Sequence, residues 1–594
     1  MLLIGALSLA LAAVVNAQGQ GVDPLLPENS PGSDCPLAGP AFPAPAHLSN
    51  STLFHDAILE FEAQLTNRSL GLEGNDTAWA IAVFSAKENR TVYERYYTPP
   101  INVSVKEVNE DSVFRLASAS KVFTVWAFLK ELGDSRFNDP ITKYVPELAN
   151  KSYHTDTVYD DIEDVRWEEV TLGELASQSA GIARDVNLDD LSVNYPTADL
   201  VALGFPELKE SAFPLCDGNL TQPPCTRKQF FDLLFQKTPI WPSSHSPAYS
   251  NIAFNLLGYA LESITGKSLE ETMTKSIFGA LNMSQSSFIK PPTSGGVIPG
   301  DLLTSGWARD IGSDNAGGGV YMSTRDFVKA GQAILQSTLL PPAQTRRWLQ
   351  PRIQTGYLGA AVGAPWEITF LESSNNRLVQ YYTKDGDLNA YHSSVVLSPE
   401  HQIGFTVLAA GTADSNAAVI RSLLKVNIGE ILMPAVEEQA KEEASVTFNG
   451  TYIDDATNSS VVIAAGYKGH TGLTVRSLTS NGVPMMGPGT SPDGLLASGL
   501  SIGNTTRLYP TTLKTVSKRS NGRGTYDSRL GFRASFHPEI VNNTVLDPCI
   551  LDWANLDGIT YGRQGFDDWV FDISEDGKAT GVNIRLLRLK LKKL

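Results

Sequence analysis

Residues 114–129 constrain the fold of this chain more strongly than any other stretch of the sequence. They read as the end of a strand that runs directly into an apolar helix, which we expect to end near Gly133. Ser118 begins that helix, and Lys121 returns to the same helix face three residues later. The large apolar side chains that follow would bury the lysine, disfavour its ammonium form and lower its pKa. The pattern therefore predicts a buried helix on which a neutral lysine can act as general base for a serine.

The same tetrapeptide also has an ordinary structural interpretation. A serine followed three residues later by a lysine occurs by chance in most chains of this length, usually as a helix cap followed by a solvated lysine. The helix N-terminus, however, presents unpaired backbone N–H groups next to Ser118. The apolar run after Lys121 and two motifs further along the chain also favour the chemical interpretation.

The second motif is Tyr249-Ser250-Asn251, which directly precedes a predicted helix that ends at Gly266. A tyrosine hydroxyl near a lysine can shuttle a proton, and an asparagine amide can hold a substrate carbonyl. The alternative is a half-buried tyrosine that anchors the entry to the helix, and for an isolated motif this alternative is the more common one.

The third motif is Lys384-Asp385-Gly386-Asp387, which follows a predicted strand at 378–383. A glycine in an edge strand lets a substrate lie against the backbone, and the next N–H can then donate to an oxyanion. Together with the N–H of Ser118 this makes two donors, each worth roughly 10²–10³ in rate. The alternative here is an exposed turn.

Ser-x-x-Lys, Tyr-x-Asn and Lys-x-Gly occur in this order, each in a fitting local context. With these motifs the chain resembles the serine beta-lactamase and penicillin-binding protein superfamily, nearest to the class C enzymes and their esterase relatives, over about residues 50–430. Residues 114–118, 170–175 with 179–181, and 316–321 match as well. The resemblance implies an α/β fold of the α+β type, in which helices and a helical subdomain flank an antiparallel sheet.

The resemblance also implies a serine enzyme that transfers an acyl group and uses neither a cofactor nor a metal. Ser118 would be the nucleophile and Lys121 its base or proton relay. Tyr249 would protonate the leaving group and later activate water. The substrate would be a small ester, lactone or amide. The sequence leaves open which of these it is, and whether water or an alcohol accepts the acyl group.

The remaining motif residues would bind the substrate. By the same resemblance, Asn251 and Lys384 would orient it, and Gly386 would let it lie against the strand. The N–H groups of Asp387 and Ser118 would form the oxyanion hole.

Three residues near the motifs need separate interpretation. Asp385 puts a carboxylate where the family often has Thr or Ser, so a substrate with its own carboxylate at that point would be disfavoured. Gln178 stands where many relatives carry a histidine. His392 follows the third motif, and a lone histidine near a strand is more often structural.

A competing motif lies at residues 499–503, where Gly-Leu-Ser-Ile-Gly matches the nucleophile elbow of alpha/beta-hydrolases. That chemistry needs a strand, a turn and a helix, followed by Asp and His partners. No helix is predicted to follow, Asn504 begins a glycosylation sequon, and His537 is the only later histidine. We interpret this motif as a turn between strands.

Length and charge narrow the class of protein. A chain of 594 residues is too long for a single core, so two or more domains are expected. Its 47 basic and 64 acidic residues give a net charge of −17, which argues against nucleic acid or an anionic membrane as partner. Residues 1–17 are apolar and end in a small-residue cleavage site, typical of a secretory signal although a charged n-region is missing. We therefore expect a secreted protein whose mature part does not span a membrane.

Glycosylation sequons agree with secretion. Their density predicts a glycosylated surface. The twelve sequons begin at Asn50, Asn67, Asn75, Asn89, Asn102, Asn150, Asn219, Asn282, Asn449, Asn458, Asn504 and Asn542.

Four cysteines in an oxidising compartment allow three disulfide pairings. We predict a bond between Cys216 and Cys225 across the short loop that is rich in Gly, Asn and Pro. Cys35 and Cys549 would then form the second bond.

The sequence predicts five successive segments. The catalytic domain is expected to contain strands at 78–98, joined by a hairpin turn, and again at 378–409. The C-terminal domain is expected to contain a hairpin at 569–586. The segments are a signal peptide (1–17), an extended arm (18–50), a beta-lactamase-like catalytic domain (51–433), a solvated linker (434–445) and a C-terminal β-rich domain (446–594).

These patterns predict a secreted serine hydrolase of the beta-lactamase-related type, laid out like secreted fungal members of that family. The same site would serve an acyltransferase or transesterase. The alternative in another class is a catalytically silent secreted binding protein that keeps the pocket. The intact set of Ser118, Lys121 and Tyr249 argues against it, because a pure binding protein has no need of those three groups.

Overall fold

The computed structural model describes most of the chain, in two compact units. One unit is Phe42–Val446, which contains all three motifs, and the other contains Thr447–Leu594. No helix among the described residues combines the length and the apolar character needed to cross a membrane. The described residues are 37–67, 71–151, 160–188, 190–217, 222–372, 377–412, 414–467, 470–486, 506–518, 526–536, 553–554 and 556–594.

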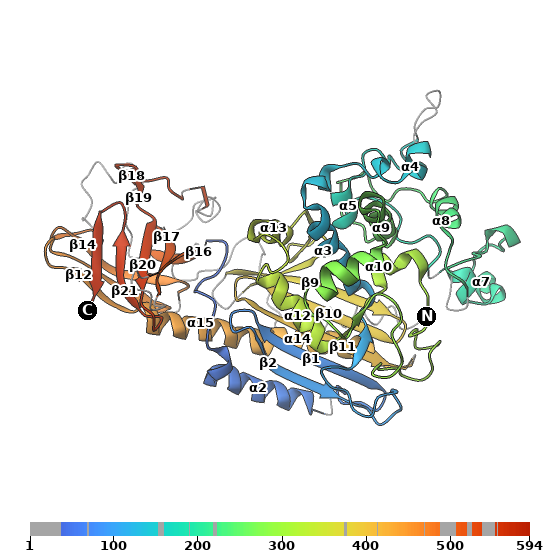
Figure 1. The fold of residues 1–594 in the computed structure, drawn as a ribbon, viewed down its shortest axis with the longest axis horizontal. Coiled ribbons are helices and arrows are strands. Elements are labelled where there is room, and N and C mark those ends of the chain that lie inside the picture. Colours follow the sequence, from blue (N-terminus) through green and yellow to red (C-terminus); the bar gives the residue numbers. More distant parts are fainter. Residues whose placement is uncertain are drawn as a thin grey trace. The chain divides into compact units, whose positions relative to one another are not determined.

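An eight-stranded antiparallel sheet forms the centre of the first unit (Figure 1). Its strands lie in the order β2-β1-β11-β10-β9-β8-β7-β6. The predicted hairpin is confirmed as β1 and β2, and the predicted later strands are confirmed as β9, β10 and β11. Strand β9 continues beyond the predicted end at 383, so the third motif lies within the strand and not after it. The bounds are β1 Thr77–Ser85, β2 Arg90–Tyr97, β6 Ile353–Gln354, β7 Ala360–Val362, β8 Glu367–Glu372, β9 Leu378–Leu388, β10 Tyr391–Ser398 and β11 Ile403–Gly411.

Helices cover both faces of this sheet, because successive side chains of a strand point to opposite faces. On β1, Trp79 and Ile81 pack in the core that contains α2 and α14, whereas Ala80 and Phe84 pack in the core that contains α3, α9 and α12. The helices are α2 Thr52–Leu65, α3 Ser120–Leu132, α4 Pro146–Lys151, α5 Leu172–Ala176, α6 Leu191–Asn194, α7 Thr197–Ala202, α8 Arg227–Leu234, α9 Ile252–Thr265, α10 Leu269–Thr272, α11 Asn315–Gly318, α12 Thr324–Leu335, α13 Pro342–Trp348, α14 Ala417–Asn427 and α15 Met433–Phe448.

Helix α3 is the buried helix that the sequence predicts. Its residues from Ser120 to Leu129 are all buried, and it stops at Gly133, whose left-handed backbone (φ 72°) accommodates the helix end. A three-stranded sheet leads into it, in the order β3 (Val113–Arg115), β5 (Tyr321–Ser323), β4 (Ser286–Ser287). The neighbouring helices α4, α5, α8 and α9 form the expected helical subdomain (Figure 1).

Residues 434–445 are not a solvated linker, which corrects the sequence interpretation. They form most of α15, a helix of 16 residues. The sequence conceals this helix because glutamates dominate its exposed positions, while the apolar residues Val436, Ala440 and Ala444 recur at helical spacing and are buried. The helix thereby continues the first unit up to the point where the second begins.

The second unit is a β-barrel with one added strand. Its nine-stranded sheet has the order β13-β12-β22-β21-β20-β17-β16-β14-β15, and a further pairing between β13 and β14 closes eight of these strands into a ring. The predicted last hairpin is confirmed as β20 and β21. The strands are β12 Gly450–Asp454, β13 Ser459–Ala465, β14 Leu473–Ser480, β15 Val483–Pro484, β16 Arg507–Lys518, β17 Tyr526–Ser535, β20 Asp568–Ile573, β21 Ala579–Ile584 and β22 Leu589–Lys593, beside a small pair, β18 Thr560–Tyr561 and β19 Gln564–Gly565.

Aromatic side chains fill this barrel. Phe571 lies 4.9 Å from Phe448, 5.0 Å from Phe532 and 6.0 Å from Tyr452, measured between ring centroids. Eight strands enclose a space just wide enough for such side chains. The competing serine motif at 499–503 lies outside the described residues.

Candidate active site

Ser118 lies where the chain turns from β3 into α3. Ala117, directly before it, has a left-handed backbone (φ 48°), a conformation that costs a non-glycine residue about 1–2 kcal/mol. Two backbone groups of Val320 fix this turn by hydrogen bonds. The N–H of Leu116 donates to the carbonyl oxygen of Val320 (2.8 Å), and the N–H of Val320 donates to Ser120 Oγ (3.0 Å). The half-buried Ser118 is therefore held on a rigid corner of the chain.

Lys121 is fully buried, and its Nζ hydrogen-bonds with three oxygen atoms. These are Ser118 Oγ at 3.1 Å, Asn251 Oδ1 at 2.7 Å and the carbonyl oxygen of Gly317 at 3.0 Å. The amide and carbonyl oxygens can only accept hydrogen bonds, whereas the serine hydroxyl can also donate one. A neutral Lys121 would therefore direct its two N–H groups at Asn251 and Gly317 and its lone pair at the Ser118 hydroxyl.

Asp185 determines which way the Asn251 amide points. Asn251 Nδ2 donates to Asp185 Oδ1 at 2.8 Å, and an ionised carboxylate only accepts. Because the nitrogen faces Asp185, the amide oxygen faces Lys121. The backbone N–H of Asn251 donates to the carbonyl oxygen of Arg184 (2.8 Å), which fixes the residue just before α9.

Tyr249 brings a second proton-carrying group to the serine. Its hydroxyl donates to Ser118 Oγ at 2.7 Å. The Nζ atoms of Lys121 and Lys384 lie 5.0 and 5.2 Å from the centre of its ring. Lys384 Nζ is itself held by Glu367 Oε1 at 2.5 Å. The structure thus places the Tyr-x-Asn and Lys-x-Gly motifs around the serine of the first motif.

The two buried lysines have pKa shifts of opposite sign. Burial lowers the pKa of Lys121; the charge of Lys384 adds to this effect and Tyr249 opposes it. Burial also acts to lower the pKa of Lys384, but Glu367 outweighs it, and the pKa is raised. For Tyr249, burial acts to raise the pKa, but the charges of Lys121 and Lys384 outweigh it, and the pKa is lowered. These shifts favour the charged form of Lys384 and disfavour the charged form of Lys121.

Gly386 marks the closest approach of β9 to the serine turn. A Cβ atom at this position would lie 2.1 Å from the carbonyl oxygen of Leu116 and 2.8 Å from the backbone nitrogen of Ala119. Only glycine leaves room for the strand to run this close to Ser118. The backbone after Gly386 therefore lies beside the serine, where a substrate carbonyl would be placed.

Comparison with known proteins identifies the family of this chain. A family model described as Beta-lactamase matches residues 77–427, a range that includes Ser118, Tyr249 and Lys384. The chain belongs to the beta-lactamase family. A second model, described as Beta-lactamase-like-like, C-terminal domain, matches residues 440–594, the part that forms the barrel.

Three similar proteins are named as beta-lactamase-like or as probable hydrolases. A beta-lactamase-like protein of Arthroderma benhamiae is 27% identical over 591 residues, covering 93% of this chain and 95% of that protein. A probable hydrolase of Phoma sp. is 28% identical and covers 81% of this chain and 78% of its own length. A probable hydrolase of Cochliobolus lunatus is 26% identical, with coverages of 75% and 73%. Among solved structures, a class C beta-lactamase covers 64% of this chain and 97% of its own, with 16% identity and a TM-score of 0.45.

Ser118 of this beta-lactamase family member borders a small pocket. Asp217, Asp314 and Arg309 contribute the charged side chains of its wall, whereas Asp387 borders it but directs its carboxylate to Arg421 on the other face of β9. Burial raises the pKa of Asp314 to about 7, although its Oδ1 accepts a hydrogen bond from an asparagine. The wall consists of Ala117, Ser118, Leu188, Asp217, Asn251, Arg309, Ile311, Asp314, Gly317, Gly318, Asp387 and Leu388.

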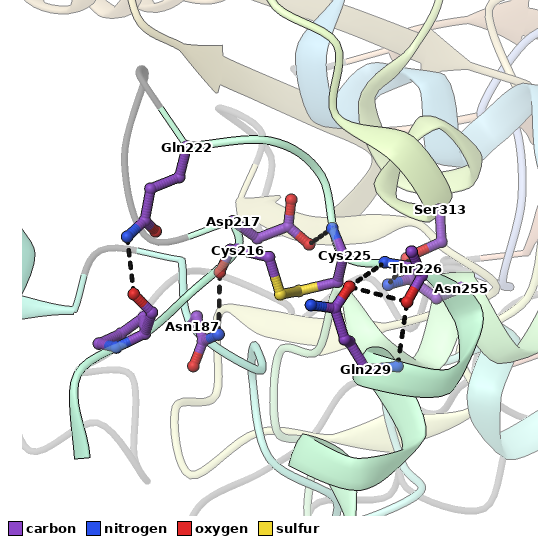
Figure 2. The surroundings of a disulfide bond; sticks show 10 residues. Asn187, Cys216, Asp217, Gln222, Cys225, Thr226, Gln229, Asn255 and Ser313 are labelled. Atoms are coloured by element: carbon purple, nitrogen blue, oxygen red, sulfur yellow. Dashed lines mark hydrogen bonds between the residues drawn. A yellow bond between two sulfur atoms is a disulfide. The ribbon is translucent and has the colours of Figure 1, made fainter. Parts of the chain in front are cut away.

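A disulfide lies next to Asp217 in this wall, and Figure 2 shows its surroundings. The predicted bond between Cys216 and Cys225 is present. Next to it, Asp217 Oδ2 accepts from the N–H of Cys225 at 3.0 Å, and Asn187 Nδ2 donates to the carbonyl oxygen of Cys216 at 2.9 Å. These contacts hold Asp217 in the cavity wall. The predicted partners Cys35 and Cys549 lie outside the described residues.

The expectation that the Asp385 carboxylate faces the substrate is wrong. Side chains alternate along β9, so Asp385 points away from Ser118 and toward α14, where Arg421 Nη1 lies 2.6 Å from its Oδ2. Gln178, the other departure from the family pattern, has its Oε1 2.7 Å from the N–H of Ser250 and so supports the second motif from behind.

Sequence reasoning missed the residues that hold the motif side chains in place. Asp185, Glu367 and Arg421 each pair with a motif residue, but none lies in a recognisable local pattern. A buried lysine that stays charged does imply a nearby carboxylate. Which acidic residue supplies it depends on the tertiary fold, since Glu367 reaches Lys384 from the neighbouring strand β8.

The predicted sequons lie mostly on the surface of the described chain. Asn449 is half-buried, and its Oδ1 accepts from the N–H of Ala465 at 2.6 Å. Asn150 lies in α4, and Asn219, Asn504 and Asn542 lie outside the described residues. The exposed sequon asparagines are Asn50, Asn67, Asn75, Asn89, Asn102, Asn282 and Asn458.

Proposed function

We propose that this protein is a serine hydrolase that cleaves a small-molecule ester, lactone or amide through an acyl-Ser118 intermediate. One observation carries the proposal. Among the oxygen atoms around Lys121 Nζ, those of Asn251 and Gly317 can only accept hydrogen bonds, and that of Ser118 carries a proton. This arrangement suits a general base aimed at a serine nucleophile.

In the acylation step, Lys121 takes the Ser118 proton while Oγ attacks the substrate carbonyl carbon. The carbonyl electron pair moves to the oxygen, which accepts hydrogen bonds from the N–H groups of Ser118 and Asp387. When the tetrahedral intermediate collapses, the bond to the leaving group breaks and Tyr249 donates its hydroxyl proton to that group. Lys121 then returns the serine proton to Tyr249.

In the deacylation step, water attacks the acyl carbon. Tyr249, whose pKa the two lysines lower, accepts a proton from the water while its own hydroxyl proton moves to the neutral Lys121. When the ester bond to Ser118 breaks, Lys121 gives that proton to Oγ, which restores the starting state. Asn251 and Lys384 would orient the bound substrate during both steps. An alcohol in place of water would make the same site a transesterase.

The charges of the cavity wall support a neutral or cationic acyl group. Asp217 and Asp314 border the cavity together with Arg309. When both carboxyl groups are ionised they outnumber the guanidinium and would repel a substrate carboxylate.

A hydrolysis panel tests the proposal. Wild type and Ser118→Ala are compared on p-nitrophenyl butyrate, a chromogenic lactone and a chromogenic cephalosporin. We expect wild type to hydrolyse one or more of these and Ser118→Ala to be at least about 10³-fold slower. If wild type hydrolyses none of them, a silent binding protein is favoured, and if Ser118→Ala is as fast as wild type, the assigned nucleophile is wrong.

We also propose that the protein is secreted and glycosylated. Exposed sequon asparagines and the Cys216–Cys225 disulfide support this, since disulfides persist in oxidising compartments. Expression of the full chain in a fungal host tests it. The protein should collect in the medium and lose mass on treatment with an N-glycosidase, and retention inside the cell without glycan would contradict the proposal.

A further inference from the structure

The strand that passes Ser118 is held from behind by a layer of charged side chains. On β9, Gly386 packs against the serine turn, so the alternate residues Asp385 and Asp387 direct their side chains to the other face, toward α14. Arg421 and Lys425 lie one turn apart on that helix. Arg421 contacts both carboxylates, and Lys425 contacts that of Asp385. We call Asp385, Asp387, Arg421 and Lys425 the charged layer.

Arg421 is the central member of the charged layer. Its Nη1 lies 2.6 Å from Asp385 Oδ2, and its Nη2 lies 3.1 and 3.3 Å from the two carboxylate oxygens of Asp387. The guanidinium is buried, and Lys425 Nζ adds contacts of 2.9 and 3.0 Å to Asp385. One planar side chain thus joins two residues of β9 that flank Gly386.

Strand β10 closes the charged layer from the side. Ser394 stands opposite Asp385 in the register and donates to its Oδ1 at 2.6 Å, while His392 stands opposite Asp387 with Nδ1 2.6 Å from its Oδ1. The two carboxylates are thereby held by two neighbouring elements, the helix and the strand. These hydrogen bonds and ion pairs leave the carboxyl-terminal end of β9 little freedom to move relative to the sheet.

The position of this strand end matters for the chemistry proposed above. Asp387 carries the backbone N–H assigned to the oxyanion hole, and Gly386 already lies within contact of Leu116 and Ala119. An oxyanion hole works only when its donors lie about 2.7–3.1 Å from the developing charge. A displacement of about 1 Å can cost about 10²-fold in rate.

We propose that Arg421 is a positioning residue, which bridges Asp385 and Asp387 and so fixes the Asp387 N–H relative to Ser118. This inference rests on the proposed acyl-Ser118 chemistry. Arg421 does not line the cavity beside Ser118 and acts from the opposite face of the strand.

The chain contains a matched control for this role. Arg377, directly before β9, is also buried and also bridges two carboxylates, Glu400 Oε1 at 2.7 Å and Glu437 Oε1 at 2.8 Å. It lies at the opposite end of β9 from Asp387. Replacing Arg377 should therefore lower the free energy of unfolding, as replacing Arg421 does, but leave the Asp387 N–H in its place beside Ser118.

The test compares Arg421→Met, Arg421→Lys and Arg377→Met in the full chain. A fluorophosphonate probe that labels Ser118 gives both the labelling rate at saturation and the concentration needed for half-saturation, and urea unfolding gives the stability. We expect Arg421→Met to lower the saturated labelling rate about 10²-fold with half-saturation changed less than about 3-fold. Arg421→Lys should be intermediate, because lysine presents no planar fork. Arg377→Met should retain the labelling rate within about 3-fold.

Equal losses of labelling rate in Arg421→Met and Arg377→Met, or no loss in either, would overturn the inference. If Arg421→Met does not fold, Asp387→Asn and Glu437→Gln replace the two methionine variants, with an expected loss of about 10-fold in the first and less than about 3-fold in the second. Equal losses in that pair overturn the inference too. If wild type itself is not labelled, the proposed function fails, and the positioning role fails with it.

Discussion

Lys121 Nζ lies 3.1 Å from Ser118 Oγ, and two of its other oxygen contacts are groups that can only accept hydrogen bonds. One of those groups is the Asn251 amide oxygen, which Asp185 turns toward the lysine. Four residues from separate parts of the chain thus determine where the lysine lone pair points. The proposed chemistry depends on this arrangement, and single substitutions can test the role of each residue in it.

Lys121→Met should abolish the reaction of Ser118. The variant keeps an unbranched buried side chain but has no atom that can accept a proton, so we expect labelling by a fluorophosphonate to slow by at least about 10³-fold. Lys143→Met, which removes an exposed lysine paired with Asp139, is the control and should label as wild type does. Comparable labelling of Lys121→Met and wild type would exclude the lysine as base.

Asp185→Asn should slow the reaction without removing any group that touches Ser118. The new amide can donate as well as accept, so the Asn251 amide is free to rotate and present Nδ2, a donor, to Lys121. We expect kcat for the panel substrate to fall about 10-fold or more, with KM little changed. Asp199→Asn, on the exposed helix α7, is the control. An unchanged kcat would show that Asp185 does not orient Asn251.

The pH dependence should contain a contribution from Asp314. Burial raises its pKa to about 7, so it takes up its negative charge only as the pH rises through that value. The new charge favours the ammonium form of Lys121, so Asp314→Asn should move the acidic limb of the pH–rate profile to lower pH. A profile identical to that of wild type would contradict this coupling.

The raised pKa of Asp314 should also make the free energy of unfolding depend on pH. The folded protein holds the Asp314 proton up to about pH 7, whereas the unfolded chain releases it near the ordinary value of 3.8. Between these values the folded state binds more protons, so the free energy of unfolding falls as the pH rises from 4 to 7. Urea unfolding at several pH values should show a weaker decrease for Asp314→Asn than for wild type. An equal decrease would assign the effect to other groups.

Gly386→Ala should damage both fold and site. Its Cβ would lie 2.1 Å from the backbone oxygen of Leu116, which cannot rotate away, and we expect a loss of about 1–3 kcal/mol in the free energy of unfolding together with slower labelling of Ser118. Gly429→Ala is the control, since a Cβ there meets no described atom within 4 Å. Unchanged stability and labelling in Gly386→Ala would contradict the close approach of β9.

Local pattern was enough to predict β1, β2, β9, β10, β11 and α3, because each carries strong apolar periodicity and a clear end signal. It failed for α15, where glutamates around Val436 and Ala440 gave the segment the composition of a linker. Closure of the barrel could not be predicted either, since the β13–β14 pairing is a property of the whole sheet.

The same distinction applies to the candidate site. The three motifs are short and could be found by spacing alone. The direction of the Asp385 side chain depends on which face of β9 meets Ser118, and the partners Asp185, Glu367 and Arg421 come from elements that only the fold brings together. Sequence therefore identifies the reacting groups, and tertiary structure supplies the residues that orient them.

The most direct test of the central claim is to map the covalent adduct. Intact wild-type protein is treated with a fluorophosphonate, digested and analysed by mass spectrometry, with Ser118→Ala as control. We predict a single phosphonyl group per chain, carried by the peptide that contains Ser118 and absent from the control. An adduct on any other residue, or no adduct on the folded protein, would contradict the account.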